Sequence, residues 1–403
     1  MDILRIDSEG LRAVETTRRT SGSVAVRQAS FDDYNQIAAL QTRNGLTSSP
    51  YQSWAALWLE NPAYHGWKAD WPIGWVIQAG AGDLVGFIGN IPIAYQFRRR
   101  QLRVATPACW VVDVAYRSYS ILLLDRVARQ RGIDLVIGTT VGPTSECGFK
   151  ALKFSKVPAG IWNESAFWIT NYRGFSQSIL RWKSIPFAAT LSYPVSAALF
   201  SRDTVKRASR QLDSSIAEVE TCSAFDIRFD EFWYTLIHEN PDVLLAVRTR
   251  ETLEWHFRDS MRDSTWIVTA SKGPVLTAYA IFQRQDNPES GLKRVRLIDF
   301  EALKGSEQML LSFLNWMLRK CRTEEIHVLE ILGCWLARPN LPQVLAPYYH
   351  RLGCWTYYYT TKNTELSETL KRPRFWAPSS FDGDASLGQG IVIKPTSRGS
   401  SHV

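Results

Sequence analysis

Residues 75–85 read WVIQAGAGDLV, and residues 266–276 read WIVTASKGPVL. Each stretch begins with tryptophan, continues through an apolar run into a turn that contains glycine, and then becomes apolar again, which is typical of a β-hairpin. The two tryptophans are 191 positions apart, and so are the turn glycines Gly82 and Gly273. The sequence therefore predicts two copies of one hairpin.

The elements predicted around the two hairpins also occur in the same order in both halves of the chain. Each half has a tryptophan-containing helix before the hairpin and, after it, a strand with an acidic residue, a helix and a short apolar strand. These elements are residues 54–58, 110–113, 122–131 and 135–138 in the first half, and residues 253–257, 297–301, 308–319 and 326–332 in the second. A repeated order of elements indicates an internal duplication. Because helices lie between strands, we predict an α/β fold (an α+β mixed sheet) built as two tandem modules.

Length and composition describe an ordinary folded protein. The chain has 403 residues, enough for two or three domains. It is 45% hydrophobic and 21% charged, which excludes a disordered protein. We predict five parts: a flexible leader (1–22), an N-terminal module (23–172), a linker with an apolar segment (173–215), a C-terminal module (216–360) and a C-terminal extension (361–403).

The net charge of +8 and the isoelectric point near 9.1 suit an anionic partner. A phosphate-bearing ligand, an acidic carrier protein and an anionic membrane surface all remain open on this ground. No motif supports nucleic-acid binding. The first residues contain no apolar signal segment, so we expect a cytoplasmic protein. None of the six cysteines has CxxC or zinc-site spacing, so we expect reduced, buried thiols and no metal site.

Residues 185–200, IPFAATLSYPVSAALF, carry no charge and are flanked by basic residues. Sixteen residues are fewer than the about 20 that a spanning helix needs, and Pro186 and Pro194 interrupt them. We expect a buried or domain-bridging segment. The alternative is an interfacial contact of the basic-flanked segment with a membrane, which would place the protein peripherally at the inner face.

Residues 110–120, WVVDVAYRSYS, join a predicted strand to a predicted helix. Such a junction presents unpaired backbone N–H groups and the positive end of the helix dipole, which together suit a pyrophosphate. An arginine beside them adds charge-assisted hydrogen bonds. The candidate ligand-binding residues are Arg117, Ser118, Tyr119 and Ser120. The alternative is an ordinary helix start.

Acidic residues on apolar strands are the candidates for a general base. Asp113, Asp299 and Glu301 have apolar neighbours, so burial could raise their pKa towards a useful range. The alternative is that each carboxylate caps a helix or pairs with arginine. Asp382 and Asp384 flank Gly383, and this triplet is expected to be an ordinary loop.

Three places in the sequence resemble the GNAT acyltransferase superfamily, which moves an acyl group from coenzyme A to an amine. Residues 26–34 (VRQASFDDY) resemble its opening strand and helix cap, and residues 110–120 its central strand and pyrophosphate loop. Residues 149–154 (FKALKF) and 349–354 (YHRLGC) resemble its Tyr-x-x-Leu-Gly-Phe ending. The resemblance covers residues 23–172 and, more faintly, 216–360, and the two-module arrangement is similar to tandem-GNAT and FemAB-like transferases.

The resemblance implies a GNAT-type N-acyltransferase that uses acetyl-CoA, another acyl-CoA or an acyl-carrier protein, without a metal. Arg117 and Ser120, with the residues between them, would hold the donor. Asp113 or Glu301 would act as the base, and Tyr349 would protonate the leaving thiolate. The acceptor would be an amine or hydroxyl on a sugar, a lipid precursor or a small metabolite.

The chain also departs from the family pattern at three positions. Ser120 and Leu122 stand where the pyrophosphate loop has small residues, and Phe149 replaces the tyrosine of the first ending. Glycine lets backbone approach a phosphate closely, which leucine does not. The alternative function is therefore a catalytically inactive, GNAT-like binding or scaffold protein.

Overall fold

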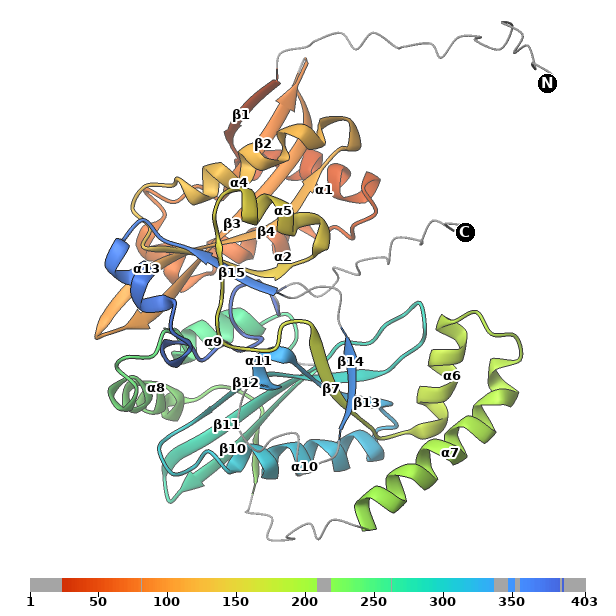
Figure 1. Ribbon diagram of the computed structural model, residues 1–403. Coiled ribbons are helices and arrows are strands. Elements are labelled where there is room, and N and C mark those ends of the chain that lie inside the picture. The colour runs from red at the N-terminus through yellow and green to blue at the C-terminus, as the bar shows by residue number, and fades with distance from the viewer. Residues whose placement is uncertain are drawn as a thin grey trace, which may run out of the picture.

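The computed structural model describes residues 24–80, 82–208, 219–261, 263–336, 347–351, 356–384 and 386–387. The predicted leader, residues 1–22, and the last residues, 388–403, lie outside this part. Two mixed β-sheets organise the described residues, and they form the upper and lower parts of Figure 1.

The first sheet has the order β1-β2-β3-β4-β5-β15-β6, with β9 also paired to β3. Its strands are β1 (Val24–Gln28), β2 (Gly74–Ala79), β3 (Asp83–Phe97), β4 (Arg100–Val112), β5 (Leu135–Val141), β6 (Ser155–Lys156), β9 (Leu245–Ala246) and β15 (Thr356–Thr360). Its helices are α1 (Tyr34–Arg43), α2 (Tyr51–Leu59), α3 (Pro62–Trp67), α4 (Ser120–Ala128) and α5 (Pro143–Ala151), with short 3-10 turns η1 (Phe31–Asp33) and η2 (Val114–Tyr119).

The second sheet has the order β14-β7-β13-β12-β11-β10-β8. Its strands are β7 (Glu164–Ile169), β8 (Glu220–Cys222), β10 (Thr265–Lys272), β11 (Val275–Arg284), β12 (Arg294–Ala302), β13 (Val328–Leu332) and β14 (Tyr348–Arg351). The remaining helices are α6 (Tyr172–Trp182), α7 (Ala188–Ala208), α8 (Ile227–Glu239), α9 (Arg250–Phe257), α10 (Met309–Thr323), α11 (Gly333–Leu336), α13 (Thr364–Leu370) and the turn η3 (Pro373–Phe375).

The predicted duplication is confirmed. The hairpins β2–β3 and β10–β11 are the two copies, and each is followed by an antiparallel strand, β4 or β12, that pairs in parallel with the next strand, β5 or β13. A helix, α4 or α10, connects the members of each parallel pair. The two modules therefore have the same topology from the hairpin to the parallel pair.

β3 and β4 are continuous strands although they contain Pro92 and Pro107. The reason is clear at Pro92, whose carbonyl accepts a hydrogen bond from Asn61 Nδ2 at 2.8 Å instead of from a strand. The backbone N of a strand residue points the same way as its carbonyl. The missing N–H of Pro92 therefore costs no bond to β4.

The two sheets exchange strands, which the predicted boundaries at 172 and 216 did not anticipate. β7 precedes the linker in sequence but pairs with β13 and β14 in the second sheet. In return, β15 pairs with β5 and β6 in the first sheet. Each module is thus completed by a strand from the other half of the chain.

The linker forms a helical hairpin, α6 and α7, instead of a buried connection. Phe187, Leu191 and Phe200 are exposed on it, so the expectation that residues 185–200 are buried is wrong. Within the described residues, no helix is both long and apolar enough to cross a bilayer.

The cysteines of the described part are free thiols and form no disulfide with one another. Cys321 and Cys334 are buried, whereas Cys147 is exposed.

A buried arginine joins the modules at the centre. Arg248, only 1% exposed, follows β9 and donates to Asp299 on β12 at 2.8 and 3.0 Å. Its Nη2 also lies 3.2 Å from Glu301 and donates to Ser379 in the C-terminal segment. One guanidinium thus connects a strand of the first sheet, a strand of the second and the end of the chain.

We expect Arg248→Met to destabilise the protein by about 3–5 kcal/mol, because it leaves the buried Asp299 carboxylate without its cation. Arg248→Lys should recover only part of this loss, since lysine lacks the planar fork. Urea-induced unfolding measures both effects. The control is Arg129→Ala, which removes an exposed i,i+4 pair with Asp125 and should cost less than about 1 kcal/mol. Equal effects of the Arg248→Met and control substitutions would contradict the central role of Arg248.

Candidate active site

Both modules contain a parallel pair of strands that separates after a short contact. β4 pairs with β5 only at Val104–Leu135 and Ala105–Val136. Beyond this point β4 pairs with β3 alone, while β5 pairs with β15. Among the described strands, therefore, none pairs with this edge of β4 from Thr106 onwards. The same separation occurs between β12 and β13 after Arg296 and Glu330.

A β-bulge bends each of the separating strands. On β4, Cys109 and Trp110 stand opposite the single residue Ile88, because Gly89 pairs with Ala108 and Phe87 with Val111. Cys109 has a φ of +52°, a left-handed conformation that costs energy in a non-glycine residue and persists mainly at functional sites. β12 has a register shift at the corresponding place. Bulges bend strands, so they account for the opening of both pairs.

Two buried polar side-chain atoms of β4 have no hydrogen-bond partner in the described residues. Thr106 Oγ1 and Trp110 Nε1 are inaccessible to solvent and make no hydrogen bond. Buried polar groups are almost always paired in native proteins. Both atoms therefore lack the partner that burial normally requires.

The predicted phosphate-binding residues lie together where β4 leads into α4. Arg117, Ser118 and Tyr119 are exposed on η2, and Ser120 begins α4 half-buried. The junction offers fewer unpaired backbone N–H groups than predicted, because the Ser120 N–H donates to the Arg117 carbonyl within a 3-10 turn. Arg117 and the positive end of α4 remain suited to an anion, whereas the Ser120 amide is already bonded.

The structure contradicts the proposed basicity of Asp113. Arg43 contacts both of its carboxylate oxygens, with Nε–Oδ1 at 3.0 Å and Nη2–Oδ2 at 2.7 Å, and Asn44 donates to Oδ1 at 2.8 Å. These bonds, above all the one from Arg43, hold the pKa of Asp113 below its usual value. Burial was expected to raise it. Asp113 instead fastens the end of β4 to α1 as a carboxylate.

The other two predicted catalytic residues lie elsewhere in the fold. Glu301 is buried on β12 beside Arg248. Tyr349 is 53% exposed on the edge strand β14, and β7 and β13 separate β14 from β12 in the sheet. The structure therefore does not bring Asp113, Glu301 and Tyr349 into one catalytic group.

The C-terminal segment, residues 379–384 and 386–387, contacts both modules, although its Asp-Gly-Asp triplet was expected to be an ordinary loop. Ser379 accepts from the hydroxyl of Tyr357 on β15 through its carbonyl, at 2.8 Å. Thr139, on β5, donates to Asp384 Oδ1 at 2.7 Å. Ser386 Oγ lies 2.6 Å from His256 Nε2 on α9. The segment thus contacts both modules, and Asp384 is bonded to β5 through Thr139 and Thr140.

Asp382 in this segment has the electrostatics of a general base. Burial raises its pKa to about 6, and Arg248 and the N–H of Ser379, which donates to Oδ2 at 2.8 Å, offset part of that rise. The Tyr95 hydroxyl, which is buried without a hydrogen-bond partner in the described residues, lies close enough to this carboxyl group for the two to influence each other's pKa. A carboxyl that exchanges its proton near neutral pH suits acid–base catalysis. The only sequence signal was Asp-Gly-Asp, which is equally typical of an exposed turn.

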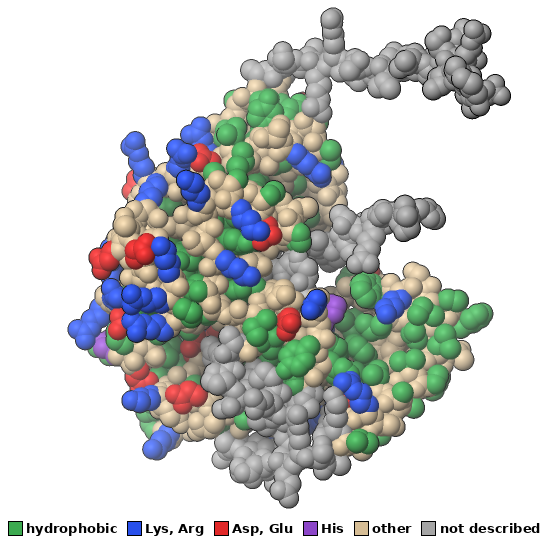
Figure 2. All heavy atoms as spheres, viewed as in Figure 1, with side chains coloured by type: hydrophobic (Ala, Val, Ile, Leu, Met, Phe, Trp, Pro, Cys, Tyr) green, Lys and Arg blue, Asp and Glu red, His purple; other side chains and the backbone are tan. Residues whose placement is uncertain are grey.

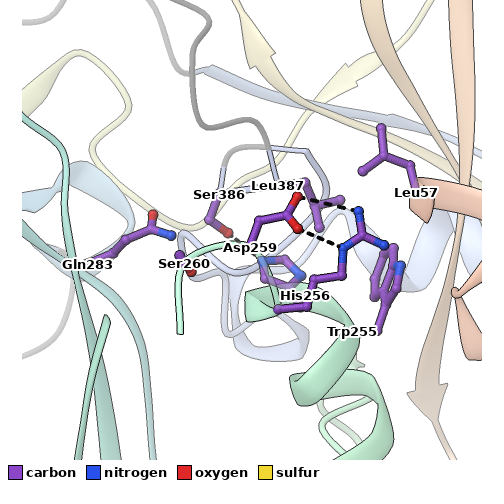
Figure 3. Close-up of a pocket in the computed structure, with 9 residues that line it drawn as sticks. Leu57, Trp255, His256, Asp259, Ser260, Gln283, Ser386 and Leu387 are labelled. Carbon is purple, nitrogen blue, oxygen red and sulfur yellow. Dashed lines mark hydrogen bonds and ion pairs between the residues drawn. The ribbon is translucent and has the colours of Figure 1, made fainter. Parts of the chain in front are cut away.

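The neighbouring histidine is a weaker candidate. Burial lowers the pKa of His256 to about 3, so the ring stays neutral at physiological pH. It lines a small pocket where α2, β11, α9 and the C-terminal segment meet; Figure 3 shows Leu57 and Gln283 on opposite sides of it. A volume of about 20 Å³ holds about one water molecule. This pocket is too small for an acyl chain.

No three or more His, Cys, Asp or Glu side chains of the described residues are grouped so as to hold a metal ion. The candidate functional features are therefore the separation of β4 from β5, the start of α4, and the buried carboxyl groups of the C-terminal segment.

No protein-family model matches the sequence, and no curated protein matches it. Solved structures do. N-myristoyltransferase from Saccharomyces cerevisiae with bound myristoyl-CoA is 12% identical, with a TM-score of 0.52, over 84% of this chain and 79% of that chain. GCN5-related N-acetyltransferases from Kribbella flavida (11% identity, TM-score 0.52, 85% of this chain and 71% of that chain) and Anabaena variabilis (12%, 0.51, 85% and 73%) are also similar. The chain therefore has the GNAT-like fold in two tandem modules.

Proposed function

We propose that the protein transfers an acyl group from acyl-coenzyme A, or from an acyl-carrier protein, to an amine or hydroxyl acceptor. The observation that carries this proposal is the free edge of β4, which begins at Thr106 and leads through Val112 to the positive end of α4. A donor with an amide-containing arm and a pyrophosphate matches both ends of this path. The bound myristoyl-CoA of the yeast relative supports a thioester donor.

The donor would be held by backbone and by Arg117. An extended amide chain can pair with a strand edge as an added strand does, so β4 offers N–H and C=O groups to the arm. Arg117 and the dipole of α4 would bind the phosphates. A backbone N–H at the bulge that is not bonded to β3 would stabilise the oxyanion.

Asp382 would accept the proton that the attacking amine must lose. When bound, the acyl thioester supplies the electrophilic carbonyl carbon. Above pH 6 Asp382 is mostly ionised and can take a proton, and below pH 6 it is mostly protonated and cannot. Tyr95, whose buried hydroxyl has no hydrogen-bond partner in the described residues, would pass the proton that Asp382 receives on to the leaving thiolate.

One observation favours the second candidate, a GNAT-like binding or scaffold protein without transfer activity. The Ser120 N–H is already bonded to Arg117, and Leu122, where the family pattern has a small residue, is exposed on α4. Both features reduce the room and the amides for a pyrophosphate. Stabilisation by a donor separates the candidates, since any ligand of the native state raises the melting temperature.

Arg117→Ala should weaken acyl-CoA binding by about 10- to 150-fold, the equivalent of one charge-assisted hydrogen bond of about 1.5–3 kcal/mol. Arg117→Lys should restore only part of the affinity. Isothermal titration calorimetry with acetyl-CoA and a long-chain acyl-CoA measures this. Arg126→Ala, an exposed arginine near the other end of α4, is the matched control and should bind normally. A folded Arg117→Ala protein with unchanged affinity would exclude this donor site.

Asp382→Asn should lower kcat by at least about 100-fold with little change in donor affinity, because a general base contributes about 10²–10⁴-fold. The wild-type rate should fall below an apparent pKa of about 6, and the variant should lose this acid limb. The raised pKa means that Asp382 destabilises the fold as the pH rises from about 4 to about 6. The variant should therefore not be less stable at pH 7 on this account.

Asp384→Asn provides the control, since Asp384 lies in the same segment and is similarly buried. It should keep the acid limb of the rate profile even if its bonds to Thr139 are weakened. Transfer is followed by release of the free thiol over a range of pH. An acid limb that persists in Asp382→Asn would assign the proton transfer to another group.

A further inference from the structure

The α6–α7 hairpin projects from the second module, at the lower right of Figure 1. The two helices pack against each other, and residues 183–187 connect them at the tip. Trp182 is 54% exposed and Phe187 81% exposed there. Two large aromatic side chains held in water beside one turn are unusual for a surface without a binding role.

The backbone of the tip holds Phe187 outwards. Phe187 has a φ of +58° and Ser184 a φ of +53°, both in the left-handed region. Such a conformation is rare for a bulky side chain and costs of the order of 1–3 kcal/mol, so it persists where surrounding structure or function requires it. The turn lets α7 fold back on α6 while Phe187 stays on the outside.

Apolar exposure continues along α7. Leu191, Tyr193, Val195 and Phe200 are all exposed on this helix. Figure 2 shows the right-hand lobe with a broad hydrophobic surface and a few basic side chains, and no acidic ones on that face. By helical spacing, Leu191 and Val195 lie on one side of α7, and Tyr193 and Phe200 lie on the opposite side, so exposed apolar side chains continue from the tip along both sides of the helix.

The exposed charged side chains of residues 172–205 are all basic. Arg173, Arg181, Lys183 and Arg202 are exposed, and the only acidic residue between 172 and 205 is Asp203. Asp203 is buried and accepts hydrogen bonds from the hydroxyls of Tyr172 at 2.8 Å and Tyr348 at 2.6 Å. The hairpin thus presents aromatic and aliphatic side chains among positive charges, with its one negative charge turned inwards.

We propose that this hairpin docks the protein on an anionic lipid bilayer, with Trp182 and Phe187 in the interfacial region and Arg181 and Lys183 at the lipid phosphates. Tryptophan and basic side chains beside an apolar face are the combination that interfacial segments use. A protein partner fits less well, because lysine is depleted in protein–protein interfaces. The proposal concerns lying on a membrane, and it does not depend on the acyltransferase function.

Co-sedimentation of the full chain with vesicles tests the docking. Binding should be stronger to vesicles of phosphatidylcholine with phosphatidylserine than to phosphatidylcholine alone, and salt should weaken it. The double variant Trp182→Ala/Phe187→Ala should bind at least about tenfold more weakly, because it removes the side chains that leave water. Arg181→Glu/Lys183→Glu should lose the preference for anionic vesicles.

Matched controls lie on other exposed helices. Tyr234→Ala removes an exposed aromatic from α8, and Lys371→Glu/Arg372→Glu reverses two charges at the end of α13. Both should bind vesicles like the wild type. The proposal is overturned if the wild-type chain does not bind anionic vesicles, or if the controls lose as much binding as the hairpin variants. Self-association that Trp182→Ala/Phe187→Ala abolishes, without vesicle binding, would assign the surface to a second copy of the chain.

Discussion

A single guanidinium group determines how the two halves of this protein meet. Arg248 is buried where β9 of the first sheet approaches β12 of the second, and its charge is balanced there by Asp299 and Glu301. A buried cation requires such partners, because an isolated charge in this environment would cost several kcal/mol. The same side chain binds Ser379 and lies over the ring of Phe381. The position of the C-terminal segment, and with it the candidate base, therefore depends on Arg248.

Much of the fold could be predicted because it is encoded locally. The two hairpins carry glycine at the turn and apolar runs on both sides of it, and the spacing of Gly82 and Gly273 indicated the duplication. The strand exchange could not be predicted in this way. β7 and β15 are short apolar segments that would fit either sheet, and only packing over a long sequence separation decides which sheet each joins. The exposed α7 was misjudged because its composition is that of a buried segment.

The candidate site was predicted only in part, and electrostatics explain the difference. Arg117 and its neighbours lie together because they are consecutive in sequence. Asp113 and Asp382 are both acidic residues near apolar ones, but Asp113 faces Arg43, whereas Asp382 is enclosed by the protein. Arg43 lies 70 positions before Asp113 in the chain, and Arg248, the arginine nearest in effect to Asp382, lies 134 positions before it. A pKa depends on such neighbours, so composition around a carboxylate does not predict its direction.

The exchanged strands also impose an order on biosynthesis. The first sheet can add β15 next to β5 only after residue 360 has been made, although β5 itself ends at Val141. Until then, the edge of β5 has no neighbouring strand on that side, and such an edge can pair with other chains. Contacts this distant in sequence also slow folding. The first sheet therefore stays incomplete until residue 360 has been synthesised, and during that time the unpaired edge of β5 is exposed to aggregation.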